Sequence, residues 1–228
     1  MTAAPPDSWG ARTGFVVGLA AEARLLSPLP CPVAIGGGTP AGARAAAGRL
    51  AAEGVMALVS FGLAGGIDPA LPPGTLLVPV AVVGRGTRWA TDPALAAALG
   101  GATRQALVAA EEIVATRAAK TRLWRETGCA GVDLESGAVA AVARDRGLPF
   151  AVLRAICDPG TQRLPPAALA ALDAEGRIAI GRVLAALARH PGQLADLLAL
   201  AREAARARRA LAARVAALAG QAAWRRAG

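Results

Sequence analysis

Residues 132–158 read VDLESGAVAAVARDRGLPFAVLRAICD and carry the clearest structural signal in the chain. An alanine-rich segment in the middle predicts a helix over Ser136–Arg146, and the apolar run Phe150–Ile156 predicts a buried strand after it. Short apolar runs and alanine-rich segments alternate in this way along much of the sequence. Such alternation is typical of an α/β sandwich, in which helices cover a sheet.

The same patterns predict the remaining elements. Further strands are expected at Phe15–Leu19, Val33–Ile35, Val55–Phe61, Leu76–Val83 and Ile113–Ala115, and further helices at Ala41–Glu53, Ala118–Glu126 and Pro166–Ala188. We expect an N-terminal extension over 1–13, one domain over 14–188 and a C-terminal extension over 189–228. Ligands of open α/β sheets bind beyond the carboxyl ends of the strands, so residues at those ends are the first candidates for a site.

The composition limits the chemistry that the chain can perform. Its 228 residues include one histidine and three cysteines, and the net charge is +9. A single histidine argues against a histidine-based triad and against a metal site, so we expect neither a metal nor another cofactor. No apolar run approaches the roughly 20 residues of a transmembrane helix, and the first residues lack the pattern of a signal peptide. We therefore expect a cytoplasmic protein with reduced cysteines.

Acidic residues follow several of the predicted strands. Glu22 follows the first strand, Asp133 and Glu135 lie in VDLES, and Asp158 ends RAICD. Asp133 and Glu135 are two residues apart and point to one side of an extended segment, where Arg154 can supply the cation they need. Carboxyl groups placed separately can protonate a leaving group, bind hydroxyls and orient a water molecule. Each of these residues is also compatible with a helix cap or a turn, and taken alone none identifies a site.

Two glycine-rich turns follow predicted strands. In the first, Gly36 and Gly38 lie between a strand and a helix, where backbone amides can hold an anion and Arg44 can assist. The alternative for this turn is a tight connection without a ligand. The second turn, FGLAGG at 61–66, ends an apolar strand and allows the backbone to approach a flat ligand closely.

Three stretches together resemble the nucleoside phosphorylase and methylthioadenosine/adenosylhomocysteine nucleosidase superfamily. They are VVGLAAEARLL at 16–26, FGLAGGIDPALPPGTLLVP at 61–79 and residues 132–158, and the resemblance covers roughly residues 14–188. GLAGGIDP and VDLESGAVA look most like the hopanoid-associated phosphorylases, which remove adenine from adenosylhopane. The resemblance implies a three-layer α/β/α sandwich with a central mixed sheet, cleavage of the N-glycosidic bond of a purine nucleoside, and a homodimer or higher assembly.

The resemblance also assigns roles to individual residues. It implies that Asp158 protonates the departing adenine, that Glu135 binds ribose hydroxyls, and that Glu22 positions the nucleophilic water or a ribose hydroxyl. It implies further that Arg154 supports Asp158. The remaining substrate contacts that it implies are Gly62, Ala64, Gly65 and Leu134.

This sequence departs from the superfamily at the place where phosphate binds. Phosphorolytic relatives hold phosphate with an arginine and a serine around the GLAGG segment, where this chain has Leu63 and Ser60. Gly36, Gly38 and Arg44 remain as candidate phosphate contacts, with inorganic phosphate as a co-substrate. Whether phosphate or water is the nucleophile therefore stays open. The aromatic residue that relatives stack on the base is also missing before VDLES.

The C-terminal extension is rich in arginine. From residue 189 onward there are eight arginines against Asp196 and Glu203, a net charge of +6. As a helix over 194–218, this segment places its leucines on one side and Arg202, Arg206 and Arg209 on the other. The apolar side can pack on the domain itself or on a second subunit, or it can contact an anionic membrane at the inner face. Nucleic acid is a weaker alternative because aromatic residues for stacking are scarce.

Three functions stay open at the level of sequence. The first is a phosphorylase or nucleosidase acting on adenosylhopane, a lipid-linked nucleoside. The second keeps the chemistry but acts on soluble methylthioadenosine or adenosylhomocysteine. The third is a non-catalytic protein of the same fold that binds membrane or nucleic acid through its C-terminal segment.

Overall fold

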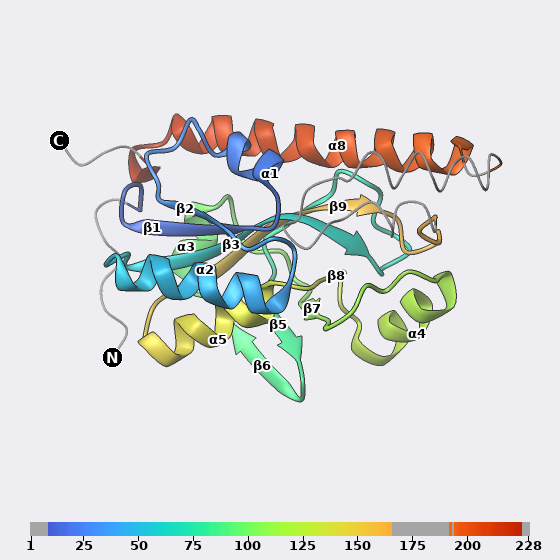
Figure 1. The fold of residues 1–228 in the computed structure, drawn as a ribbon, viewed down its shortest axis with the longest axis horizontal. Helices are drawn as coiled ribbons and strands as arrows, with labels where there is room; N and C mark the ends of the chain where they lie inside the picture. Colours follow the sequence, from blue (N-terminus) through green and yellow to red (C-terminus); the bar gives the residue numbers. More distant parts are fainter. Residues whose placement is uncertain (1–8, 166–191, 193, 225–228) are drawn as a thin grey trace.

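The computed structural model describes residues 9–165, 192 and 194–224, and the strands of these residues form one mixed sheet (Figure 1). The strands are β1 (Thr13–Val17), β2 (Val33–Ile35), β3 (Ala57–Gly66), β4 (Leu76–Leu77), β5 (Ala81–Gly84), β6 (Thr87–Ala90), β7 (Leu107–Ala109), β8 (Gly131–Asp133) and β9 (Phe150–Asp158). Their order is β2-β1-β3-β8-β7-β5-β6, and β9 pairs with β3 and β4 beside this path.

Three long parallel strands form the centre of the sheet. β1 pairs with β3 from Thr13 opposite Ala57, and β3 pairs with β9 from Leu58 opposite Phe150. Nearly every residue of these strands is buried, as expected for parallel strands covered on both faces. Because the three strands run in the same direction, their carboxyl ends meet at one edge, where Glu22 follows β1 and Asp158 ends β9.

Helices cover both faces of the sheet (Figure 1). α2 (Pro40–Ala52) and α5 (Ser136–Arg146) pack in one hydrophobic cluster, whereas residues of α1 (Ala20–Leu25), α3 (Pro93–Ala98) and α8 (Leu194–Ala219) pack in the other. α4 (Arg117–Thr127) lies near the carboxyl edge. The three-layer α/β/α sandwich with a mixed sheet is therefore confirmed.

The predicted helices agree closely with the observed ones, because each carries its own start and stop signals. Thr39 and Thr116 cap α2 and α4 through side-chain oxygens, and Gly128 and Gly147 end α4 and α5 in the left-handed region. The predicted helix at Pro166–Ala188 lies outside the described residues.

Two strand predictions are wrong. The segment Leu76–Val83 is not one strand: β4 pairs with β9, and the chain then changes partners around Pro79 before β5 pairs with β6 and β7. The segment Ile113–Ala115 is not a strand either. This segment pairs with no neighbouring strand. Its backbone hydrogen bond to another segment is the one that the amide of Leu164 donates to the carbonyl of Ala115.

The helix α8 packs on the sheet of its own domain. Ala207, Leu211, Val215 and Leu218 are fully buried in the cluster that also contains Phe15 and Phe61. The short 3-10 helix after it, η2 (Ala222–Trp224), buries Trp224, whose Nε1 donates to the carbonyl of Ala98 at 2.9 Å. Arg202, Arg206 and Arg209 are exposed. Within the described ranges, no helix combines the length and the apolar character needed to cross a bilayer.

Candidate active site

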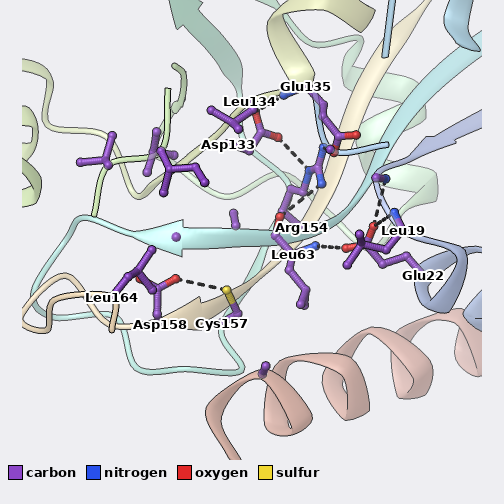
Figure 2. A pocket seen from close by; sticks show the side chains of 18 of the residues that line it. Leu19, Glu22, Leu63, Asp133, Leu134, Glu135, Arg154, Cys157, Asp158 and Leu164 are labelled. Atoms are coloured by element: carbon purple, nitrogen blue, oxygen red, sulfur yellow. Dashed lines mark hydrogen bonds and ion pairs between the residues drawn. The ribbon is translucent and has the colours of Figure 1, made fainter. Parts of the chain in front are cut away.

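A cavity of about 320 Å³ opens at the carboxyl edge of the central strands (Figure 2). Its two ends differ in chemistry: Glu22, Glu135 and Arg154 lie together at one end, and Asp158 lies at the other, with β3 between them. The predicted acids are therefore brought into one site by the sheet. The lining residues, in chain order, are Gly18, Leu19, Glu22, Gly38, Leu63, Ala64, Gly65, Glu112, Ile113, Val114, Val132, Asp133, Leu134, Glu135, Arg154, Cys157, Asp158, Leu164, Leu200 and Ala204.

Glu22 is held by backbone amides. It lies in the first turn of α1 and is buried, and its Oε2 accepts from the amides of Gly18 at 3.0 Å and Leu19 at 2.9 Å. Its Oε1 accepts from the amide of Leu63 at 2.8 Å. Hydrogen bonds from three backbone amides fix this carboxylate in place.

Arg154 is the cation that joins the acids of the first end. It is 1% exposed, its Nη2 donates to Glu135 Oε2 at 3.0 Å, and its Nε lies 2.8 Å from Asp133 Oδ2. Burial acts to lower the pKa of Arg154, but the charges of Asp133 and Glu135 outweigh it, so the pKa lies above its usual range. Ser60 Oγ, at 2.7 Å from Nη2, and the carbonyl of Leu63, at 3.2 Å from Nη1, complete the set of acceptors. The expected role of Arg154 as the cation for Asp133 and Glu135 agrees with this geometry.

Glu135 lines the cavity with a carboxyl group of which only one oxygen is paired. Its Oε1 is buried and has no hydrogen-bond partner among the described residues, whereas Oε2 contacts Arg154. Burial raises the pKa of Glu135 to about 7, with the charge of Arg154 acting in the opposite sense. A Cβ on Gly18 would lie 3.0 Å from both carboxylate oxygens, so the missing side chain leaves room for them. A buried acceptor without a partner is costly and marks a place where a ligand donor fits.

Asp133 performs a structural task beside Glu135. Its Oδ1 accepts from the amides of Glu135 at 3.3 Å and Ser136 at 3.1 Å, and its Oδ2 accepts from the hydroxyl of Ser136. These bonds cap the start of α5 and fix the backbone that carries Glu135. Asp133 therefore holds both the helix and the cation in place.

The expectation that Arg154 supports Asp158 is wrong. Arg154 contacts the acids at the other end of the cavity, and the register between β3 and β9 shifts by one residue at Ala64/Gly65, just before Asp158. Asp158 instead forms an ion pair with Lys120, whose Nζ also donates to the carbonyl of Pro159 at 3.0 Å. Lys120 comes from α4 and carries no local sequence signal for this contact, because a lone lysine on a polar helix predicts a solvated side chain.

Cys157 is a thiol and not a nucleophile. Burial, followed by the charge of Asp158, raises the pKa of Cys157 well above its ordinary value. Its Sγ lies 3.2 Å from Asp158 Oδ1. Because the thiolate is the reactive form of cysteine, this environment leaves Cys157 inert.

Small and apolar residues form the walls between the two ends. Ala64, Gly65 and Leu134, which are predicted substrate contacts, line the cavity, and a Cβ on Gly65 would lie 3.4 Å from Asp158 Oδ1. Gly62 lies behind Glu22 and does not line the cavity. None of the lining residues is aromatic, so no aromatic side chain of the described part stacks on a ligand here. Residues that were not among the predicted contacts also line the walls: Leu19, Leu63, Glu112, Ile113, Val114, Leu164, Leu200 and Ala204.

The candidate phosphate contacts are not gathered in the cavity. Gly38 lines it, but the amide of Gly36 donates to the carbonyl of Val17 at 2.7 Å and is not free to hold an anion. Arg44 is exposed and lines a separate cavity beside Trp89. Among the lining residues, Arg154 is the one cation, and its bonds to carboxylates are already made.

Solved structures share the fold. A methylthioadenosine/S-adenosylhomocysteine nucleosidase from Campylobacter jejuni has a TM-score of 0.60 at 16% identity, covering 78% of this chain and 96% of that one. The corresponding nucleosidase from Colwellia psychrerythraea, solved with adenine, has a TM-score of 0.59 at 18% identity, covering 66% and 83%. Futalosine hydrolase from Helicobacter pylori has a TM-score of 0.56 at 17% identity, covering 63% and 86%.

Sequence comparison identifies the family. No curated protein sequence matches the chain. The family model described as the phosphorylase superfamily matches residues 30–189, well over half of the chain. Together with the shared fold, this match shows that the chain belongs to the phosphorylase superfamily.

Proposed function

We propose that the chain hydrolyses the N-glycosidic bond of a purine nucleoside and releases adenine. The observation that carries this proposal is the placement of Asp158 at one end of the cavity and of Glu22 and Glu135 at the other. A nucleoside has the matching polarity, with a nitrogenous base at one end and hydroxyls at the other. The solved nucleosidase from Colwellia psychrerythraea contains adenine, which supports the choice of base.

Each acid has a distinct task in this reaction. Departure of the base leaves negative charge on the purine and positive charge on the sugar. A proton from Asp158 neutralises the purine, and the carboxylates of Glu135 and Glu22 stabilise the charge on the sugar. Glu135 Oε1 accepts a ribose hydroxyl because it is free. Glu22 already accepts hydrogen bonds from three backbone amides. A carboxylate has about four acceptor sites, and the remaining one orients the attacking water.

The charge of the cavity favours water over phosphate as the nucleophile. Its wall contains Glu22, Asp133, Glu135 and Asp158 against one arginine, Arg154, which is already paired with Asp133 and Glu135. A phosphate dianion needs cations or free amides, and placing it among carboxylates is unfavourable. Phosphorolysis is the alternative, and it predicts release of adenine only when phosphate is present.

We propose that the nucleoside has a long apolar substituent at its 5′ position, and adenosylhopane is such a substrate. Apolar side chains from three parts of the chain, Leu63, Leu164 and Leu200, line the cavity. Further along α8, Leu194 is 51% exposed and Leu198 is 47% exposed, although both are large apolar residues. Leucines exposed on a helix that also lines the pocket suit a substrate whose tail lies in a membrane. Methylthioadenosine or adenosylhomocysteine is the soluble alternative.

Membrane contact and a homodimer belong to the same proposal. The leucines at the start of α8 and the exposed Arg202, Arg206 and Arg209 suit an anionic bilayer surface. Binding to vesicles that contain anionic lipid, measured by flotation with and without salt, tests the first part. Light scattering of the purified protein measures its mass in solution and tests the second.

The decisive assay follows free adenine chromatographically. Adenosylhopane and methylthioadenosine are each incubated with the protein, with and without inorganic phosphate. We expect release of adenine from the lipid-linked nucleoside without phosphate, and loss of at least about 100-fold in rate in Asp158→Asn. Asp145→Asn is the matched control, because Asp145 is an exposed residue on α5 that pairs with Arg144 at the surface. Absence of base release from every purine nucleoside, together with tight vesicle binding, would leave only the non-catalytic alternative.

A further inference from the structure

Lys120 is the only lysine in the chain, among 25 basic residues that are otherwise arginine. It is also the one residue of α4 that is fully buried, with an exposure of 1%. The three arginines of α4, Arg117, Arg122 and Arg125, are all exposed, and the side chain of Arg122 is 77% exposed. All the other basic residues counted here are arginines, and the single lysine is the one in contact with Asp158.

The contacts of Lys120 connect it to the cavity through Asp158 alone. Its Nζ pairs with Asp158 Oδ2 and donates to the carbonyl of Pro159, and Lys120 does not line the cavity. Asp158 is the lining residue, and its Oδ1 lies on the side of Gly65 and Cys157. Lys120 therefore touches no bound substrate and acts through the carboxyl group that does.

Other ionisable groups surround this pair. Cys157 precedes Asp158, Glu203 of α8 is close enough for Asp158 and Lys120 to influence it, and Glu22 influences Cys157 from α1. Burial and the charge of Asp158 raise the pKa of Glu203. Cys157 stays a thiol because its pKa is raised, so Glu203 is the neighbour whose titration must be separated from that of the pair.

We infer that Lys120 and Asp158 share one proton and that Lys120 is the source of the proton given to the departing purine. This inference rests on the proposed function. In the resting pair, the proton lies on the lysine nitrogen, and its transfer to Asp158 gives a neutral amine beside a neutral carboxylic acid. When the glycosidic bond breaks, the bonding electrons go to the purine, the O–H bond of Asp158 breaks, and an N–H bond forms on the purine. The pair is left as an amine and a carboxylate, and a proton from solvent restores the ammonium.

A buried environment and the choice of lysine both favour this route. Burial disfavours separate charges, so the neutral form of the pair costs less here than it does in water. Lysine can release its proton in such a site, whereas the guanidinium of arginine remains protonated in proteins. Because the pair binds one proton as a unit, its titration belongs to both residues together.

The test compares pH–rate profiles of the wild-type protein, Lys120→Met and Lys120→Arg, with Arg122→Met as a matched control on the exposed side of α4. An ammonium holds its proton to higher pH than a carboxylic acid does. We therefore expect the alkaline limb of kcat to move to lower pH in Lys120→Met, and to stay in place in Arg122→Met and in Glu203→Gln. In Lys120→Arg, the charge persists but the proton cannot be released, so kcat falls at least about 10-fold while KM changes little.

Nuclear magnetic resonance of lysine labelled with ¹⁵N supplies a test that needs no variant. With one lysine in the sequence, the side-chain signal belongs to Lys120 without assignment. We expect this signal to titrate with the same midpoint as the alkaline limb of kcat in the wild-type protein. A midpoint elsewhere, or a Lys120→Arg protein with wild-type kcat, overturns the inference. If neither the wild-type protein nor Arg122→Met releases adenine, the proposed function itself fails, and the two failures are thus distinguishable.

Discussion

Gly62 and Glu22 pack so closely that a side chain at Gly62 has no space: a Cβ there would lie 2.6 Å from Cδ of Glu22. The same Cβ would lie 2.8 Å from Nη1 of Arg154, and Gly62 has a φ of 143°, which non-glycine residues rarely adopt. The absence of a side chain at this one position therefore lets the acid of α1 and the cation of β9 both pack against the backbone of β3.

The first prediction concerns Gly62→Ala. The added methyl group displaces Glu22 from its three amides, so we expect kcat to fall at least about 10-fold and the free energy of unfolding to fall by about 1–3 kcal/mol. Adenine release and denaturant unfolding measure the two effects. Gly48→Ala is the control, because Gly48 lies within α2 and nothing is within 4 Å of a Cβ there. Wild-type kcat in Gly62→Ala would show that the position of Glu22 is not critical.

The second prediction concerns the pH dependence of catalysis at Glu135. Burial raises the pKa of Glu135 from 4.5 to about 7. The ionised form accepts a ribose hydroxyl better than the acid does, so kcat/KM should rise as the pH increases through about 7. Glu135→Gln should lose most of the rate at neutral pH together with this acidic limb. A limb that persists unchanged in Glu135→Gln belongs to another group.

The third prediction concerns the stability contributed by the same carboxyl group. Because its pKa is higher in the folded state than the ordinary 4.5, the folded chain binds the proton more tightly than the unfolded chain. This contribution is complete below a pH of about 4.5 and is lost as the pH rises to about 7. The free energy of unfolding of the wild-type protein should therefore fall across this window relative to Glu135→Gln. Denaturant unfolding at a series of pH values measures the difference, and parallel curves for the two proteins contradict it.

The fourth prediction concerns the packing of the C-terminal segment. Trp224 is fully buried, its ring centroid lies 5.7 Å from that of Phe15, and its indole donates to the carbonyl of Ala98. We expect Trp224→Ala to lower the free energy of unfolding by about 3–5 kcal/mol. Arg209→Ala, at an exposed position of α8, should change it by no more than about 0.5 kcal/mol. Equal stability of the two variants would mean that the C-terminal segment is not part of the cooperative core.

The fifth prediction concerns selectivity between nucleosides. Leu198 is exposed on α8, whereas Leu200 lines the cavity. A tail that leaves the pocket and crosses α8 loses apolar contact in Leu198→Ser, about one kcal/mol of transfer free energy. We therefore expect KM for a nucleoside with a long apolar substituent to rise several-fold. KM for methylthioadenosine should stay within about twofold of the wild-type value. Equal changes for both substrates argue that the tail lies elsewhere.

The sequence predicts the parts of the fold that depend on local patterns. The helix Ser136–Arg146 agrees with the prediction because its alanine pattern ends at a glycine. Glu22 and Asp158 share one edge of the sheet because β1, β3 and β9 are parallel, whereas β8, which leads to Glu135, runs antiparallel to β3. The break in Leu76–Val83 depends on which strands lie alongside, and an apolar run does not contain that information. Ile113 lines the cavity from a segment that is neither helix nor strand. Such a segment has no periodic sequence pattern from which its position could be predicted.

The distribution of cations was only half predicted. Arg154 follows from the pair of acids two residues apart, which need one shared cation on a neighbouring strand. Lys120 reaches Asp158 from 38 residues away, and the packing of α4 decides that contact. The observation that could have drawn attention to Lys120 is its status as the only lysine among 25 basic residues.

A crystal structure with a non-hydrolysable purine nucleoside tests the central claim most directly. The account predicts that the base binds with its imidazole nitrogen in hydrogen-bond contact with Asp158, and that a ribose hydroxyl donates to Oε1 of Glu135. A nucleoside bound outside this cavity, or with its base beside Glu22 and its sugar beside Asp158, would contradict the account.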